Sequence, residues 1–148
     1  MAISRLTLSI QRLVVGLSGL QMAYFAWSYI TGSSRNTFPI LEQLFKPEFA
    51  AEFTESGSWQ SIVPFLGSTY LSIAIISLLA LFFRPGRELR LLILGLASVH
   101  WVMAIIRVTI APAELYIDGA ATAASSVQAL IGALLVVAAL LPYPKQSV

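Results

Sequence analysis

Long apolar stretches separated by short polar ones dominate the hydrophobic pattern of the chain. Four of them, at about residues 13–30, 62–83, 89–110 and 120–141, approach the roughly 20 residues that a helix needs to cross a bilayer. A backbone inside lipid must satisfy its hydrogen bonds within its own segment, and no alternation typical of barrel strands is present in the sequence. The pattern therefore predicts an all-α, integral membrane four-helix bundle that forms a single transmembrane domain over residues 1–148. The first stretch follows basic residues as a signal peptide would, but its length and aromatic end favour a retained helix.

The connection between the first two stretches has a pattern of its own. Apolar side chains recur there at spacings of three and four residues: Ile40, Leu41, Leu44, Phe45, Phe49 and Phe53. Acidic residues take much of the opposite side, so the segment at about residues 38–54 is predicted to form short amphipathic helices at the membrane interface. The pattern fits two interpretations equally: a cap over the helix ends, or a lid over a ligand. As a lid, it would turn Leu44 and Phe49 toward the bundle or the interface and keep Glu42 and Glu52 in water.

Basic residues predict the orientation of the bundle. Three arginines crowd the short loop at residues 84–90, while Arg5 and Arg12 precede the first helix and Lys145 follows the last. By the positive-inside tendency, this loop and both the N- and C-termini are cytoplasmic, which predicts a multi-pass protein of the inner (cytoplasmic) membrane. The Pro85–Gly86 pair makes the loop tight, so we expect the second and third helices to be antiparallel neighbours.

Composition removes several classes of function. The chain is 57% hydrophobic and 11% charged, whereas soluble domains carry about 25% charged residues. Its net charge of +2 includes no long basic run, which argues against nucleic-acid binding. With no cysteine and one histidine, disulfides, thiolate sites and multi-histidine metal sites within one chain are excluded. Haem ligation through His100 is the one cofactor alternative, and no second ligand or attachment motif accompanies it, so no cofactor is predicted.

Polar residues concentrate in the halves of the helices that lie away from the basic loop. His100 and Arg107 share one side of the third helix, and similar polar stripes run along the other three. Because lipid offers no hydrogen bonds, the stripes are best buried against each other, which predicts a polar-lined pocket in the outer leaflet. The candidate ligand-binding residues are Gln21, Tyr24, Ser68, Tyr70, Glu114, Asp118, Ser125 and Gln128. We expect His100 and Arg107 to face inward, toward Gln21, Tyr24 and Gln128.

His100 and Arg107 are the candidate catalytic residues. Histidine titrates near neutrality and suits proton transfer, while Arg107 would hold or polarise an oxygen of the substrate. The alternatives are a neutral His100 hydrogen-bonded to a neighbouring helix, and an Arg107 that reaches the headgroups or pairs with Glu114 or Asp118.

Short motifs resemble two groups of small membrane proteins. RLVVGLSGL at residues 12–20, GSTYLSIAIISLLALF at residues 67–82 and ELYIDG at residues 114–119 resemble the DoxX-like superfamily of four-helix membrane proteins. LASVHW at residues 96–101 and the basic hairpin resemble, less closely, the ergosterol-biosynthesis scaffold family. The first resemblance implies a quinone-reducing role suggested for some relatives, and the second implies tethering of enzymes. Neither supplies a catalytic residue set that matches this chain.

Two functions of different classes follow. The first is a membrane protein that handles a small lipophilic ligand, with His100 transferring a proton if it is an enzyme of the isomerase or oxidoreductase type. The alternative is a non-catalytic accessory or scaffold subunit of a membrane enzyme complex. The predicted partners are the lipid bilayer, a small lipophilic molecule, and a second copy of the chain or another membrane protein.

Overall fold

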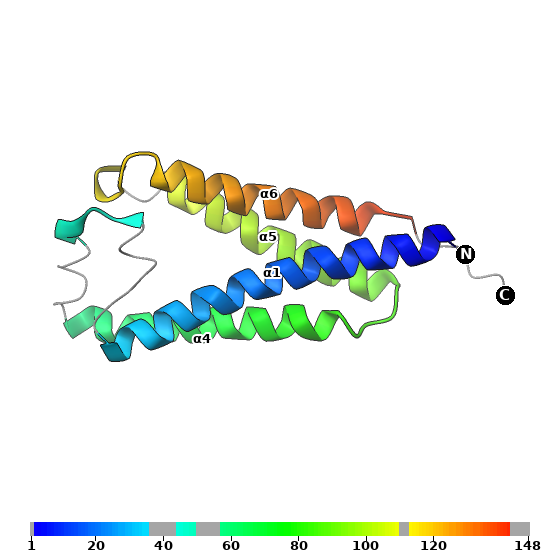
Figure 1. The fold of residues 1–148 in the computed structure, drawn as a ribbon, viewed down its shortest axis with the longest axis horizontal. Helices are drawn as coiled ribbons and strands as arrows, with labels where there is room; N and C mark the ends of the chain where they lie inside the picture. The colour runs from blue at the N-terminus through cyan, green and yellow to red at the C-terminus, as the bar shows by residue number, and fades with distance from the viewer. Residues whose placement is uncertain (1, 36–43, 50–56, 110–112, 143–148) are drawn as a thin grey trace.

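The computed structural model describes residues 2–35, 44–49, 57–109 and 113–142, with side chains described throughout except at residues 2–5, 32–35, 57–61 and 113. The long helices are α1 (Ala2–Arg35), α4 (Gly57–Ala80), α5 (Arg87–Thr109) and α6 (Ala120–Leu140), and a 3-10 turn, η1, covers Ala113–Leu115 (Figure 1). Each long helix contains a stretch that is long and apolar enough to cross a membrane. The prediction of an all-helical, multi-pass membrane bundle is confirmed at this level.

The helix boundaries differ from the predicted ones chiefly in α1, which has 34 residues rather than the stretch 13–30. Its apolar part is Leu6–Thr31. Apolar runs mark the part of a helix that suits lipid, and polar residues on either side continue the same helix. At the other extreme, α4 ends at Ala80, because the N–H groups of Leu81, Phe82 and Phe83 bond three residues back and tighten the chain into the hairpin.

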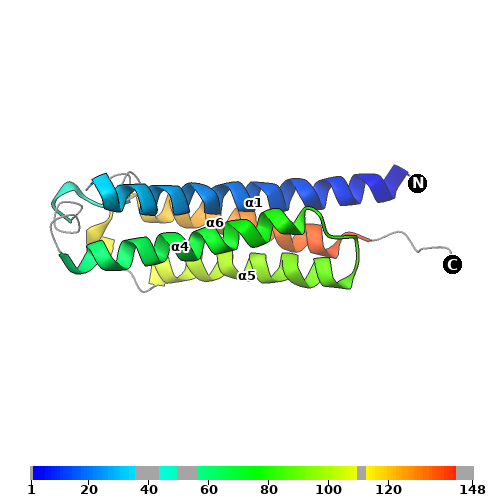
Figure 2. The same ribbon diagram turned by 90° about the horizontal axis from the view of Figure 1, so that it is seen from below.

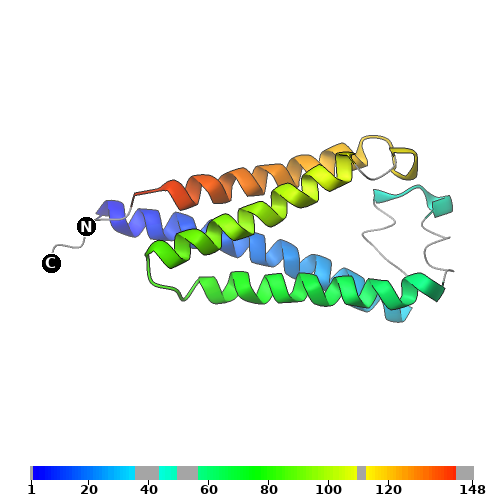
Figure 3. The same cartoon turned by 180° about the vertical axis from the view of Figure 1, so that it is seen from behind.

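The four helices are arranged as two pairs. α1 packs along α4 and α5 packs along α6, and the pairs meet mainly where α1 contacts α6. Figures 1 and 3 show the pairs lying close together at the end that holds the α4–α5 hairpin, the start of α1 and the end of α6, here the hairpin end. They separate toward the opposite end, here the loop end, and Figure 2 shows the same bundle from below.

The expectation that α4 and α5 pack as neighbours is therefore wrong, because these two helices make little contact beyond their hairpin. A tight loop fixes where two helices meet and leaves their packing to side chains. The face of α5 that holds Ala97 and Ala104 is buried against α6. Gly132 of α6 also lets the Trp101 indole approach, since a Cβ there would lie 2.8 Å from its ring nitrogen.

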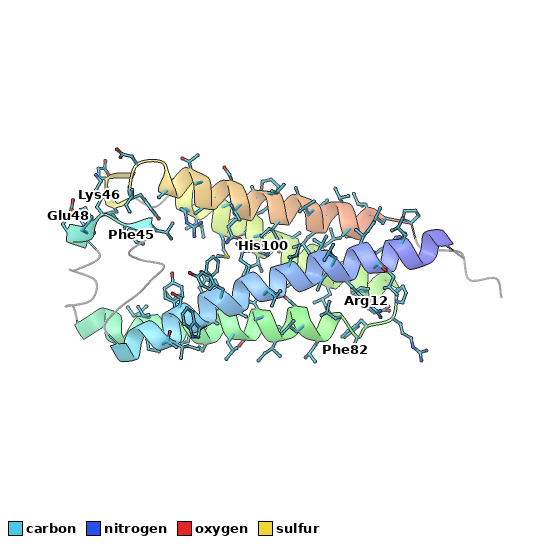
Figure 4. All side chains as sticks on the ribbon, viewed as in Figure 1. Arg12, Phe45, Lys46, Glu48, Phe82 and His100 are labelled. Atoms are coloured by element: carbon cyan, nitrogen blue, oxygen red, sulfur yellow. The ribbon has the colours of Figure 1, made fainter. Side chains whose placement is uncertain are left out.

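The apolar core lies toward the hairpin end, and the surface of the bundle is apolar too. The core joins all four helices and consists of Val14, Val15, Ala80, Leu89, Ile93, Leu96, Ala97, Leu135, Ala138 and Ala139. Large apolar side chains are exposed on every helix, as Figure 4 shows by the many side chains that point outward. An exposed surface of this kind is stable in lipid and would aggregate in water.

At the loop end, two connections join across the gap between the helix pairs. The N–H of Lys46 donates to Leu115 O at 2.9 Å and the N–H of Ile117 donates to Leu44 O at 3.0 Å. These bonds form an isolated antiparallel bridge between Phe45 and Tyr116, whose rings stack at 4.8 Å. The connection that follows α1 is thereby tied to the one that precedes α6.

The predicted interfacial segment at residues 38–54 is described only in part. Its backbone is helical at Leu44 and again at residues 47–49, with the Phe45 bridge between them. Leu44 and Phe49 are half-buried, as the lid hypothesis requires. Glu42 and Glu52 lie outside the described residues.

Candidate functional site

His100 is fully buried near the middle of the bundle, where it joins three helices (Figure 4). Its Nδ1–H donates to Gln128 Oε1 of α6 at 2.5 Å, and the Ser18 hydroxyl of α1 donates to Nε2 at 2.8 Å. A neutral imidazole satisfies both bonds, because one ring nitrogen is a donor and the other an acceptor. The inward orientation of His100 is confirmed. Its hydrogen bonds to Ser18 and Gln128 correspond to the alternative in which a neutral His100 bonds to neighbouring helices.

Ser18 is the partner that the predicted site omits. It is fully buried, like His100 and Gln128. Ser18, Gln21 and Tyr24 form one polar stripe on α1 at the depth of His100, and this spacing is the signal that could have selected it.

Arg107 lies about two turns beyond His100 on α5, between two cavities. The smaller, about 190 Å³ in volume, is here the glutamine cavity; it is lined by Gln21, Tyr24, Phe25, Leu44, Arg107, Ala124, Val127 and Gln128. The larger, about 390 Å³, is the tyrosine cavity; it is lined by Tyr29, Leu44, Phe45, Leu66, Tyr70, Met103, Ile106, Arg107 and Tyr116. Arg107 and Leu44 belong to both. The prediction that Arg107 faces Gln21, Tyr24 and Gln128 is confirmed by the glutamine cavity.

Arg107 has no acidic partner among the described residues. Its Nη1 is buried without a hydrogen-bond partner, and so is the side-chain oxygen of Gln21 in the same cavity. A buried polar group left unsatisfied costs about 1–3 kcal/mol, and more when it is charged. The glutamine cavity therefore holds an unpaired donor and an unpaired acceptor that a bound molecule could satisfy together.

Aromatic rings form the walls of the tyrosine cavity. Tyr29 of α1 stacks on Tyr70 of α4, with ring centroids 5.6 Å apart and planes 7° apart. Phe25 meets Tyr70 edge-on at 5.4 Å, and the stacked Phe45–Tyr116 pair lies at the loop end. Of these residues, only Tyr70 belongs to the predicted site. The others depend on the pairing of α1 with α4 and on the bridge between distant loops, which no spacing within one helix reveals.

Four predicted ligand-binding residues lie outside both cavities. Ser68 is exposed and donates to Phe65 O of its own helix at 2.7 Å. Glu114 and Asp118 are exposed, and neither pairs with Arg107. Ser125 is buried with an unpartnered hydroxyl, and it lines a separate groove of about 250 Å³ between α5 and α6.

Within the described part of the chain, no group of three or more His, Asp or Glu side chains could hold a metal ion. No protein family model, no curated protein and no solved structure matches the chain. The resemblance to the DoxX-like superfamily stays a prediction.

Proposed function

We propose that this protein binds a small lipophilic molecule at the loop end of its bundle, with an oxygen of the ligand held by Arg107. The observation that carries the proposal is the position of Arg107, a partly buried cation between two cavities with an unpartnered Nη1. Hydrogen bonds from a cationic donor to an oxygen acceptor are about twice as strong as neutral ones. A ligand oxygen would therefore recover the free energy that the unpaired guanidinium costs.

The cavities themselves support a lipophilic ligand. The tyrosine cavity falls in the range of roughly 300–1,000 Å³ found for small-molecule sites, and its lining is mostly aromatic and aliphatic with Arg107 as a charged group. Both cavities lie between helices whose outer surfaces are apolar, so a molecule dissolved in the bilayer would reach them without crossing water. We place the loop end on the outer side of the cytoplasmic membrane, in keeping with the basic hairpin at the other end.

The position of His100 favours ligand binding over catalysis as the function of the site. Neither cavity is lined by His100, and both of its ring nitrogens are engaged by Ser18 and Gln128. Its bond to Gln128 holds one wall of the glutamine cavity in place. Proton transfer by His100, as an isomerase or oxidoreductase would need, requires one of these partners to release a ring nitrogen, and it stays a prediction.

Native mass spectrometry of the protein extracted in mild detergent tests the proposal. We expect the wild-type protein to carry a small lipophilic molecule. In the Arg107→Gln protein, the fraction of chains that carry this molecule should be at least about tenfold lower. Arg84→Gln, which removes an exposed arginine of the hairpin, is the matched control and should retain it.

Equal occupancy in the Arg107→Gln and Arg84→Gln proteins would contradict the site. A stoichiometric protein partner without any small molecule would favour the accessory or scaffold function instead. The observation that supports this second candidate is that both ring nitrogens of His100 are hydrogen-bonded within the protein, as in a purely structural role.

A further inference from the structure

We infer that the head group of the ligand is a hydroxycarboxylate, an anionic carboxylate with a hydroxyl on the neighbouring carbon. This inference rests on the proposed function and concerns the same site. It follows from the hydrogen-bonding groups that the glutamine cavity leaves unused.

The cavity offers donors on one side. Arg107 Nη1 is buried and unpartnered. Gln128 also lines the cavity, and because its Oε1 accepts from His100, its amide nitrogen is the group that remains for a ligand. Two donors, one of them cationic, match the two oxygens of a carboxylate.

The cavity offers an acceptor on the other side. The buried Oε1 of Gln21 has no partner and lines the same space. A plain carboxylate carries only acceptors and would leave this oxygen unsatisfied. A hydroxyl beside the carboxylate supplies the missing donor. A second carboxylate would instead place another acceptor oxygen against the Gln21 Oε1, and the two oxygens would repel each other.

The charge of the site fits an anion. Arg107 carries the positive charge, and none of the described acidic side chains neutralises it. In the low dielectric of a membrane protein, an unpaired cation favours an anionic ligand over a neutral one of the same shape.

The apolar remainder of the ligand fits the tyrosine cavity, which begins on the other side of Arg107. Apart from Arg107, its walls are the rings of Tyr29, Tyr70, Phe45 and Tyr116 with the aliphatic side chains of Leu44, Leu66, Met103 and Ile106. A medium-length alkyl chain attached to the head group would occupy this cavity and keep water away from the pair formed by the carboxylate and Arg107.

Three probes of equal chain length separate these contributions: 2-hydroxydecanoate, decanoate and 1,2-decanediol, titrated calorimetrically at one fixed detergent concentration. In the wild-type protein we expect 2-hydroxydecanoate to bind two- to tenfold more tightly than decanoate, the value of roughly one neutral hydrogen bond. Both acids should bind at least about tenfold more tightly than the diol, because only a carboxylate forms a charge-assisted pair with Arg107.

Variants assign each preference to its residue. Gln21→Leu should remove the advantage of the hydroxyl without weakening decanoate, which leaves the Gln21 oxygen unsatisfied in the wild-type protein. Gln21→Met serves if the first variant is not recovered folded. Gln11→Leu is the matched control, because Gln11 is a buried glutamine of the same helix that lines neither cavity. Arg107→Gln should weaken both acids by a larger factor than the diol, because only the acids lose a charge-assisted pair.

The outcomes distinguish this inference from the proposal beneath it. If decanoate binds in an Arg107-dependent way but the hydroxyl adds nothing, the hydroxycarboxylate is wrong and the lipophilic ligand stands. If the hydroxyl advantage survives Gln21→Leu and Gln21→Met, the assignment to Gln21 is overturned. If all three probes bind alike and Arg107→Gln changes none of them, both the inference and the proposed site are wrong.

Discussion

The hydrogen bond between Ser18 and His100 should stabilise the bundle, and the chain contains a matched control for measuring it. Ser18 of α1 and Ser77 of α4 are both fully buried serines within helices. Ser18 donates to His100 of another helix, whereas Ser77 donates to Ile73 O of its own helix at 2.8 Å. Replacing each by alanine removes one hydroxyl from an equally buried site. The difference between the two variants therefore isolates the bond between helices.

The size of the effect follows from known values for membrane helices. Hydrogen bonds between transmembrane helices contribute about 0.6 kcal/mol on average and up to about 1.7 kcal/mol. Ser18→Ala also leaves His100 Nε2 with no donor, which places it toward the upper value. We expect Ser18→Ala to unfold with a free energy lower than that of Ser77→Ala by about 0.6–1.7 kcal/mol. In the unfolding equilibrium this is roughly a three- to seventeenfold difference.

Reversible unfolding in mixed micelles, followed by circular dichroism, measures this difference. A double-mutant cycle with His100→Leu supplies the second test, because the excess cost of Ser18→Ala should vanish once the imidazole is gone. Equal destabilisation by Ser18→Ala and Ser77→Ala in the wild-type background would refute the reasoning. An excess that persists in the His100→Leu background would show that packing, and not the hydrogen bond, is its cause.

Three further predictions concern packing and topology. Gly67→Ala should destabilise the protein by about 1–3 kcal/mol in the same unfolding assay, because its Cβ would lie 2.7 Å from Ile30 Cγ1 and 3.2 Å from the Ile30 backbone nitrogen. Gly16→Ala, which meets nothing within 4 Å, should instead stabilise α1 by about 0.5–1 kcal/mol, and the reverse order would contradict the packing of α1 on α4. The double variant Phe45→Cys with Tyr116→Cys should form a disulfide under mild oxidation, because the two residues face each other as a non-hydrogen-bonded pair; gel mobility measures this. Equally fast cross-linking of the control variant, Phe45→Cys with Ile117→Cys, would argue against the bridge. In the cysteine-free chain, a thiol reagent that cannot cross membranes should label Glu48→Cys in intact cells and Glu88→Cys only after permeabilisation, and labelling of both from outside would overturn the orientation.

The sequence predicts the parts of this structure that depend on one helix at a time. Apolar runs locate the four helices, and the spacing of His100 and Arg107 places both on the inner face of α5. The arrangement of the helices is not predictable in this way, since the tight hairpin suggests an α4–α5 contact that side-chain packing does not form.

Two serines of α4, Ser68 and Ser72, show a second reason why the sequence does not predict every orientation. The absence of partners in lipid favours an inward orientation of Ser68 and Ser72. Their hydroxyls donate instead to Phe65 O and Ser68 O of their own helix, so these side chains stay exposed without an unsatisfied group. His100 and Gln128 cannot satisfy themselves in this way, and their inward orientation could be predicted for that reason.

Because the long helices pack mainly in consecutive pairs, we expect each pair to form as its two helices enter the membrane in chain order. α1 and α4 are synthesised first and form one hairpin-like unit, and α5 and α6 form the second. α5 brings His100, a polar side chain that lipid cannot supply with hydrogen bonds. Ser18 is already in the bilayer when α5 enters and offers His100 a hydrogen bond, while Gln128 arrives one helix later and completes the set. The helix that carries His100 thus follows one of its two hydrogen-bond partners in the chain and directly precedes the other.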